Sequence, residues 1–169
     1  MKIKISELPD VAKRSEAINK KFFSRLKKKP PKNLDIIIKE IHEEVFLDID
    51  CLECANCCKS ISPIVSDKDI ERITKFLKVK PSAFTEKYLH LDEDNDYVFN
   101  STPCPFLDES NYCKIYDVRP KACSEYPHTS QPKFINRLNL TIKNSFYCPA
   151  VFNIVEKMKE GIKTYNKIN

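Results

Sequence analysis

The sequence predicts a small α+β domain that is mainly helical, with short β-hairpin elements and irregular loops around its cysteines. Three observations favour this class. Apolar residues recur at helical spacing in several long segments, only short runs alternate as strands do, and eight cysteines occupy the stretches between these segments. The chain has 169 residues, a length that fits one folded core and is small enough to benefit from cross-links.

Two helices are predicted ahead of the first cysteines. Apolar residues spaced by seven and four predict a helix from Pro9 to about Lys29, which the pair Pro30-Pro31 ends. Apolar residues one, three and four apart predict a second helix over residues 33–46.

After these cysteines, Ser66 and Asp69 form a pattern similar to a capping box, which predicts the start of a helix that runs to about Leu77. A short helix is expected over residues 81–89. Residues 97–99 are predicted to form a strand.

The C-terminal part combines a turn, two predicted strands and a helix. Residues 108–111 predict a turn that leads into residues 112–116, so a small hairpin is expected here. The alternation of apolar residues over 138–142 predicts a strand, and an apolar stripe after Pro149 predicts a C-terminal helix.

The charge distribution separates a basic N-terminal arm from the rest. Residues 1–33 carry eleven Lys or Arg against three Asp or Glu, a balance of +8 in a chain of net charge +5. We therefore predict a basic helix or arm over 1–33 and a single cysteine-cluster domain over 34–169, with its motif region at 51–150. A solvated face is the simplest interpretation of the lysines, so we do not expect nucleic acid as a partner.

Glycine is nearly absent, since Gly161 is the only one where average usage would give about twelve. Rossmann and Walker loops need several glycines, so we exclude an in-chain nucleotide loop or an ordinary methyl-donor loop.

No segment approaches the roughly 20 apolar residues of a membrane span, and the N-terminus lacks a signal-peptide pattern. We therefore expect a cytoplasmic protein with reduced thiols.

Disulfides, a dithiol redox pair and metal ligation are the three interpretations of the cysteines. A bridge between the adjacent Cys57 and Cys58 would be strained, and a thioredoxin-type pair needs a βαβ context that is missing. Closely spaced thiolates repel one another unless a soft cation holds them, so the spacing favours a metal. The predicted ligands are Cys51, Cys54, Cys57, Cys58, Cys104, Cys113, Cys123 and Cys148.

The metal is predicted to be iron, as an iron-sulfur cluster of the 4Fe-4S type, or zinc. The prolines after Cys104 and Cys148 resemble the cysteine-proline pairs of iron-sulfur proteins, and the three-residue rhythm of Cys51, Cys54 and Cys57 resembles a ferredoxin loop. No complete ferredoxin motif is present, and eight thiols would equally make two four-cysteine zinc sites. We favour iron-sulfur.

The ordered cysteines resemble a known family. The run Cys51-x-x-Cys54-x-x-Cys57-Cys58, followed by Cys104-Pro105-Phe106-Leu107, the segment 113–127 and a late Cys148, is similar to the YkgJ-type cysteine-cluster family. The resemblance covers about residues 51–150. It implies a domain that chelates zinc or iron, and the family also includes flagellin lysine N-methylases. Asn56 departs from the family pattern, where a glycine is frequent, but Asn tolerates a left-handed backbone.

The resemblance also implies which residues surround the site, namely Tyr116, Arg119, Pro120, Tyr126 and Pro127. Arg119 offers up to five hydrogen-bond donors to a carbonyl, a thiolate or an anionic substrate. An ion pair with Asp117 or Glu125 is its alternative role. His128 is a candidate extra ligand, although eight thiols already suffice.

Three functions remain open. The first is a metal-binding protein with one iron-sulfur cluster and additional thiols, or with two mononuclear sites. The second is an enzyme similar to the protein-lysine N-methylases, which would use S-adenosylmethionine and a protein substrate or partner; the single glycine argues against it. The third is a zinc-stapled module that binds nucleic acid through residues 1–33.

Overall fold

The computed structural model describes residues 4–168, with side chains to residue 162. Contacts divide the chain into two compact units, of which the first holds residues up to Asp50 and from Pro127 onward, and the second holds Cys51–Tyr126. The protein is mostly helical with a small two-stranded antiparallel hairpin, so the predicted fold class is confirmed.

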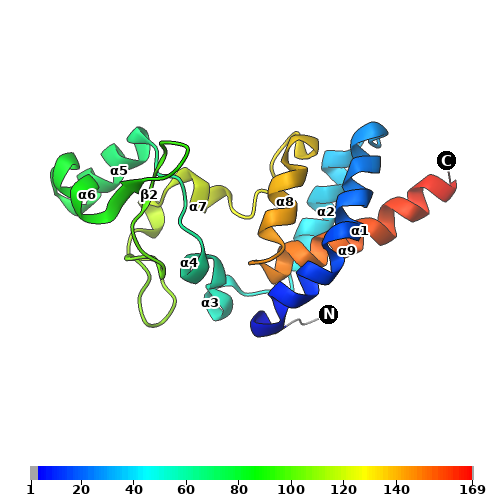
Figure 1. Ribbon diagram of the computed structural model, residues 1–169, viewed down its shortest axis with the longest axis horizontal. Helices are drawn as coiled ribbons and strands as arrows, with labels where there is room; N and C mark the ends of the chain where they lie inside the picture. Colours follow the sequence, from blue (N-terminus) through cyan, green and yellow to red (C-terminus); the bar gives the residue numbers. More distant parts are fainter. Residues whose placement is uncertain (1–3, 169) are drawn as a thin grey trace. The chain divides into compact units, whose positions relative to one another are not determined.

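Four α-helices build the first unit: α1 (Leu8–Lys28), α2 (Leu34–Phe46), α8 (Leu138–Asn144) and α9 (Pro149–Ile168). Two 3-10 turns precede α1 and α8, at Ile5–Glu7 and Phe134–Arg137. Helix α2 packs against α9, and these helices enclose a core whose fully buried members include Ile38, Phe134, Ile154 and Met158 (Figure 1).

The predicted N-terminal and C-terminal helices are confirmed, with bounds that differ by at most one residue at the ends of α1 and α2. Phe23 and Leu26 of α1 join the core of the first unit, while the basic residues of that helix are exposed. The boundary at residue 33 stays a prediction, whereas the contacts divide the chain after Asp50 and before Pro127.

The predicted strand over 138–142 is wrong, because these residues belong to α8. Leu138 and Ile142 are four residues apart, a spacing that keeps them on one side in a helix as well as in a strand. The residues between them show the helical periodicity, because Thr141 is buried whereas Leu140 is 38% exposed. Thr141 Oγ1 also donates to the carbonyl of Arg137, one helical turn back.

The second unit contains short elements: α3 (Cys51–Cys54), α4 (Asn56–Ser60), α5 (Asp67–Leu77), α6 (Pro81–Tyr88), β1 (Leu89–Leu91), β2 (Tyr97–Phe99), a 3-10 turn (Tyr116–Val118) and α7 (Lys121–Glu125). The predicted capping box is present at the start of α5, where Ser66 and Asp69 exchange hydrogen bonds. A core of eight buried apolar residues, among them Ile73, Phe84 and Phe99, holds these elements together.

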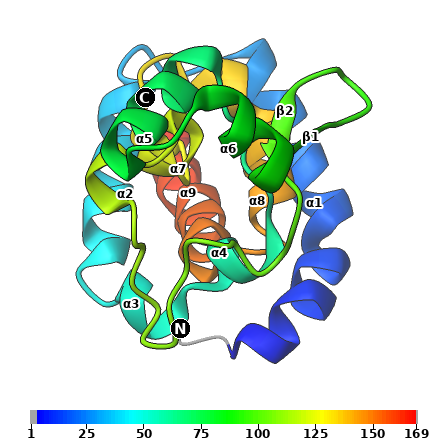
Figure 2. The same cartoon turned by 90° about the vertical axis from the view of Figure 1, so that its left-hand side faces the viewer.

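The predicted hairpin is only partly right. Strand β2 is present, but it pairs in antiparallel fashion with β1, and Figure 2 shows the turn between them extending from the pair. Asp92 shapes this turn by accepting the backbone amides of Asp94 and Asp96. Residues 112–116 form no strand, and their pairing is limited to a single bridge between Leu107 and Cys113.

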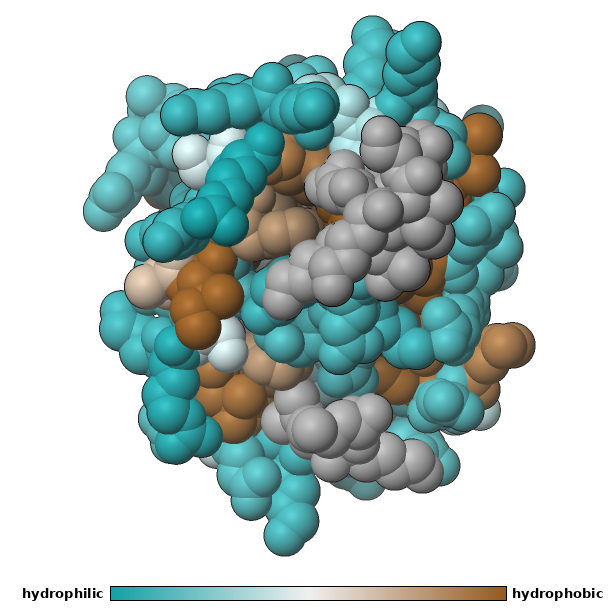
Figure 3. All heavy atoms as spheres, turned by 90° about the vertical axis from the view of Figure 1, so that its right-hand side faces the viewer, coloured by the Kyte–Doolittle hydropathy of each residue, from teal (hydrophilic) through white to brown (hydrophobic). Residues whose placement is uncertain are grey.

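Hydrophilic side chains cover most of the face drawn in Figure 3, with hydrophobic patches between them. Among the helices of residues 4–168, none has the length and apolar character that crossing a membrane requires.

Candidate metal centre

The first four cysteines lie on two very short helices that a left-handed residue separates. Ala55 has φ 46° and ψ 16°, and its amide donates to the carbonyl of Cys51 at 2.7 Å, so α3 ends there and α4 begins at Asn56. The left-handed residue directly precedes Asn56, which stands where the family pattern often has a glycine. Seven cysteines lie in the second unit and Cys148 lies in the first; all eight carry thiols.

Cys57 and Cys58 are neighbours in space as well as in sequence. Their sulfur atoms are 4.0 Å apart, and both side chains are half-buried. A hydrogen bond from Cys57 lowers the pKa of Cys58 to about 7, because it favours the thiolate more than burial opposes it; the charge of Lys59 adds to this effect. Cys58 is therefore the most easily ionised thiol among those whose pKa is shifted.

Backbone hydrogen bonds join the Cys104 loop to Cys58. The amide of Cys104 donates to the carbonyl of Cys58 at 2.8 Å. The same loop pairs with the next cysteine, since Leu107 and Cys113 form a β-bridge and the amide of Lys114 donates to the carbonyl of Phe106 at 2.8 Å. Three cysteines far apart in sequence are thereby brought to one place.

Backbone amides donate hydrogen bonds to two of these sulfur atoms. Burial raises the pKa of Cys104 to about 11, but amide hydrogen bonds from Phe106 and Leu107 act in the opposite direction. Burial also raises the pKa of Cys113, which receives a hydrogen bond from the amide of Ile115. Amide donors directed at sulfur stabilise a thiolate and therefore suit a metal ligand.

Cys123 is the fourth thiol of a group in which the charge of Cys58 acts on the other three. It lies on α7, and burial raises its pKa to about 12. The charge of Cys58 raises the pKa values of Cys104, Cys113 and Cys123, while Arg119 lowers those of Cys113 and Cys123. Within residues 4–168, however, no three Cys, His, Asp or Glu side chains are already arranged to hold a metal ion.

Arg119 and Tyr116 form a stacked pair on the segment between Cys113 and Cys123. The guanidinium carbon lies 3.8 Å from the centre of the Tyr116 ring, and the same side chain donates to the carbonyl of Tyr116 at 2.5 Å. Glu125, considered as an ion-pair partner of Arg119, lies 3.5 Å from Lys121.

The other residues predicted to surround the site are divided between the two units. Pro120 precedes α7, and its carbonyl accepts the amide of Cys123 at 2.9 Å. Tyr126 follows α7, and its hydroxyl oxygen is buried. In the first unit, Pro127 accepts a hydrogen bond from Asn144, and His128 has φ 68° in a turn.

Cys148 directly precedes α9 in the first unit. Its amide donates to the carbonyl of Asn144 at 2.9 Å, its carbonyl accepts the amide of Phe152, and its half-buried side chain packs against the core of that unit. The roles of all eight cysteines as ligands stay predictions.

Asp69 and Arg72 of α5 are two polar residues that the sequence did not indicate as part of the site. Asp69 is buried and accepts the backbone amide of Lys121 at 3.1 Å, and Arg72 donates to the carbonyl of Arg119 at 2.8 Å. The capping-box pattern predicted only the local role of Asp69. No signal in the sequence indicated its contact with a residue 52 positions away.

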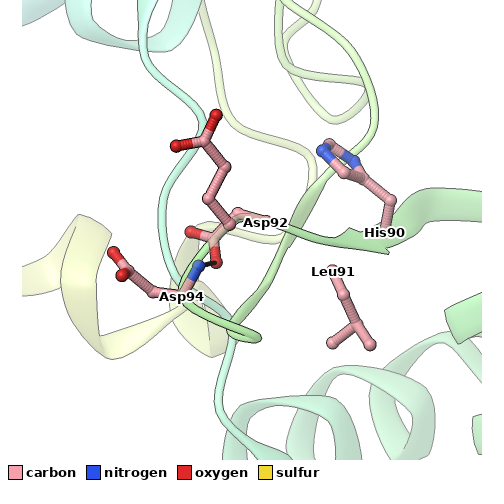
Figure 4. A pocket seen from close by; sticks show the side chains of 5 residues that line it. His90, Leu91, Asp92 and Asp94 are labelled. Carbon is pink, nitrogen blue, oxygen red and sulfur yellow. Dashed lines mark hydrogen bonds between the residues drawn. The ribbon is translucent and has the colours of Figure 1, made fainter.

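An open pocket lies at the turn of the β-hairpin. Its lining residues are His90, Leu91, Asp92, Glu93 and Asp94, and Figure 4 shows the Asp92 carboxylate accepting the amide of Asp94. None of the cysteines lines this pocket, so it is separate from the group of thiols.

The part of the chain that carries the eight cysteines is similar to known proteins. An uncharacterized protein of Methanocaldococcus jannaschii is 31% identical over 124 residues, which are 68% of this chain and 65% of that protein. The chain thus spans slightly less than two thirds of the length of this relative. No solved structure matches the chain. The family CxxCxxCC, described as "Putative zinc- or iron-chelating domain", matches residues 50–149. The chain therefore belongs to the CxxCxxCC family of zinc- or iron-chelating domains, as the cysteine pattern predicted.

Proposed function

We propose that the protein binds iron, as an iron-sulfur cluster, through a four-thiolate site made by Cys58, Cys104, Cys113 and Cys123. One observation carries the proposal: the charge of Cys58 acts on Cys104, Cys113 and Cys123, and backbone amides donate hydrogen bonds to the sulfurs of Cys104 and Cys113. Such donors hold a thiolate in a fixed orientation and reduce the free-energy cost of its negative charge.

The surroundings of the four thiols suit an anionic centre. Four thiolates with zinc or with an oxidised 4Fe-4S cluster carry a net charge of about −2, so nearby donors and cations stabilise the loaded state. The amides of Phe106, Leu107 and Ile115 supply donors, and Arg119 supplies a positive charge that acts on Cys113 and Cys123. When bound, an iron-sulfur cluster would supply electron transfer, whereas zinc would supply a structural cross-link.

The choice of iron over zinc rests on the sequence. Proline follows Cys104, one of the four proposed ligands, as in many iron-sulfur proteins. Cys148, also followed by proline, and the three-residue repeat of Cys51, Cys54 and Cys57 lie outside these four and would supply additional thiols. A cytoplasmic location, which we also propose, would keep the thiols reduced and available to the metal.

Metal analysis of the anaerobically purified protein tests the proposal. Brown protein that contains iron and acid-labile sulfide would support a cluster, while colourless protein with stoichiometric zinc would reject the cluster and leave a four-thiolate zinc site. Protein that retains neither metal would contradict both assignments.

Single Cys→Ser variants test the four ligands. We expect substitution of Cys58, Cys104, Cys113 or Cys123 to lower metal content or speed metal loss to a chelator, because each removes a charged ligand. The matched variants at Cys51, Cys54, Cys57 and Cys148 test for further ligands, and loss of a second metal from them would indicate a second site. Full metal retention in the first four variants would refute the proposed site.

A further inference from the structure

We propose that Asp69, together with Arg72, is a positioning residue of the metal site, which holds the segment 119–123 so that Cys123 stays beside the other thiols. This inference rests on the proposed four-thiolate site. Neither residue is a candidate ligand, and both lie on α5, between Cys58 and Cys104 in the sequence.

The two carboxylate oxygens of Asp69 have different partners. Oδ2 accepts the amide of Ser66 at 3.0 Å and its hydroxyl at 2.6 Å, which completes the capping box of α5. Oδ1 accepts Nη2 of Arg72 at 2.5 Å and the amide of Lys121 at 3.1 Å. One oxygen therefore serves the helix locally, and the other reaches a distant segment of the chain.

The distant contacts hold both sides of Pro120. Nη2 of Arg72 donates to the carbonyl of Arg119 at 2.8 Å, while Asp69 accepts the amide of Lys121. The carbonyl of Pro120 in turn accepts the amide of Cys123 at 2.9 Å. The position of Cys123 is thereby linked to α5 through a short series of hydrogen bonds.

The same segment leads back to Cys113. The amide of Tyr116 donates to the carbonyl of Cys113 at 3.1 Å, and Arg119 stacks on Tyr116. Anchoring Arg119 therefore restrains the chain between two proposed ligands. This restraint matters because an ordered arrangement of thiols lowers the entropy cost of gathering them around a metal.

The environment of Asp69 keeps it charged for this role. Its side chain is 3% exposed, and Arg72 forms an ion pair with it at 2.5 Å. Burial alone would raise the pKa of Asp69, but hydrogen bonds from Ser66, Arg72 and Lys121 outweigh burial, so its pKa lies below the ordinary value. A buried carboxylate with four donors is rigid, as a positioning group must be.

Substitutions that separate the two oxygens' roles test the inference. In the full chain, Asp69→Asn and Arg72→Gln should increase the rate of zinc or iron loss to excess chelator by about 10- to 100-fold, the range typical of residues that orient metal ligands. Arg72→Lys, which keeps a positive donor beside Asp69, should restore most of the metal retention.

Two controls match these variants in chemistry. Ser66→Ala removes the local cap and leaves Oδ1 with Arg72 and Lys121. Asp35→Asn alters a carboxylate of the first unit that accepts the amides of Lys133 and Phe134. Both should lower thermal stability and leave the rate of metal loss unchanged.

The outcomes distinguish this inference from the proposed function. If Arg72→Gln loses metal no faster than Ser66→Ala at similar thermal stability, the positioning role is refuted while the metal site stands. If Asp69→Asn does not fold, the rates of metal loss from Arg72→Gln and Arg72→Lys test the positioning role by themselves. If the unaltered protein binds neither zinc nor iron, the proposed site itself fails.

Discussion

The backbone at Ala55 determines how the Cys51–Cys58 stretch can present its thiols. A left-handed residue lets α3 end and α4 start within one position, so Cys54 and Cys57 follow different helix axes. An L-residue in this conformation costs roughly 1–2 kcal/mol, whereas glycine adopts it without a steric penalty.

Ala55→Gly is therefore expected to stabilise the protein. Relief of strain should exceed the entropy that glycine adds to the unfolded chain, with a net gain of up to about 1 kcal/mol in the free energy of unfolding. Urea unfolding of the metal-loaded protein measures the difference.

The matched control is Ala12→Gly, at a buried position inside α1. It should destabilise the protein by about 1 kcal/mol, because glycine is a poor helix former. An Ala55→Gly variant that loses as much stability as Ala12→Gly would contradict the assigned left-handed backbone.

At the scale of elements, α8 shows how a short apolar pattern can indicate the wrong structure. Leu138, Leu140 and Ile142 alternate as in a strand, but only the first and last are buried. In a strand all three would share one face, whereas in a helix Leu140 lies about 200° from Leu138 around the axis.

Alanine substitutions distinguish the two structures. Leu138→Ala should lower the free energy of unfolding by about 2–5 kcal/mol, because it removes a buried side chain from the core of the first unit. Leu140→Ala should change it by about 0.5 kcal/mol or less, since this residue is partly exposed. Similar losses from both substitutions in denaturant unfolding would favour the strand.

At the scale of the whole molecule, the two units differ in what stabilises them. The first has helices of up to 21 residues around a core of fourteen buried apolar residues. The cysteines of the second lie in loops, at Cys104 and Cys113, or on helices of four or five residues, which are too short to be stable without tertiary or metal contacts.

Removal of the metal should therefore affect the second unit most. Hydrogen exchange before and after chelation should show faster exchange at residues 51–60 and 104–125, because metal ligation replaces apolar burial there. The amides of α2 and the middle of α9 should keep their protection. Equal loss of protection in α2 would contradict this division, and unchanged exchange in both units would mean that the metal does not stabilise the fold.

Local signals were sufficient for much of the fold. Proline positions, apolar periodicity and the Ser66-Asp69 pattern predicted the main helices, because these signals act within one or two turns of the chain. They failed for residues 138–142 and 112–116, where short apolar runs fit two periods and tertiary contacts decide between them.

The order and spacing of the thiols are properties of the chain, so the residues alone were sufficient to predict a zinc- or iron-chelating cysteine motif. The fold was needed to bring Cys104 against Cys58, to place Cys113 and Cys123 where the charge of Cys58 acts on them, and to connect Asp69 with the amide of Lys121. These contacts join residues 46 to 65 positions apart, and no local preference specifies such pairings.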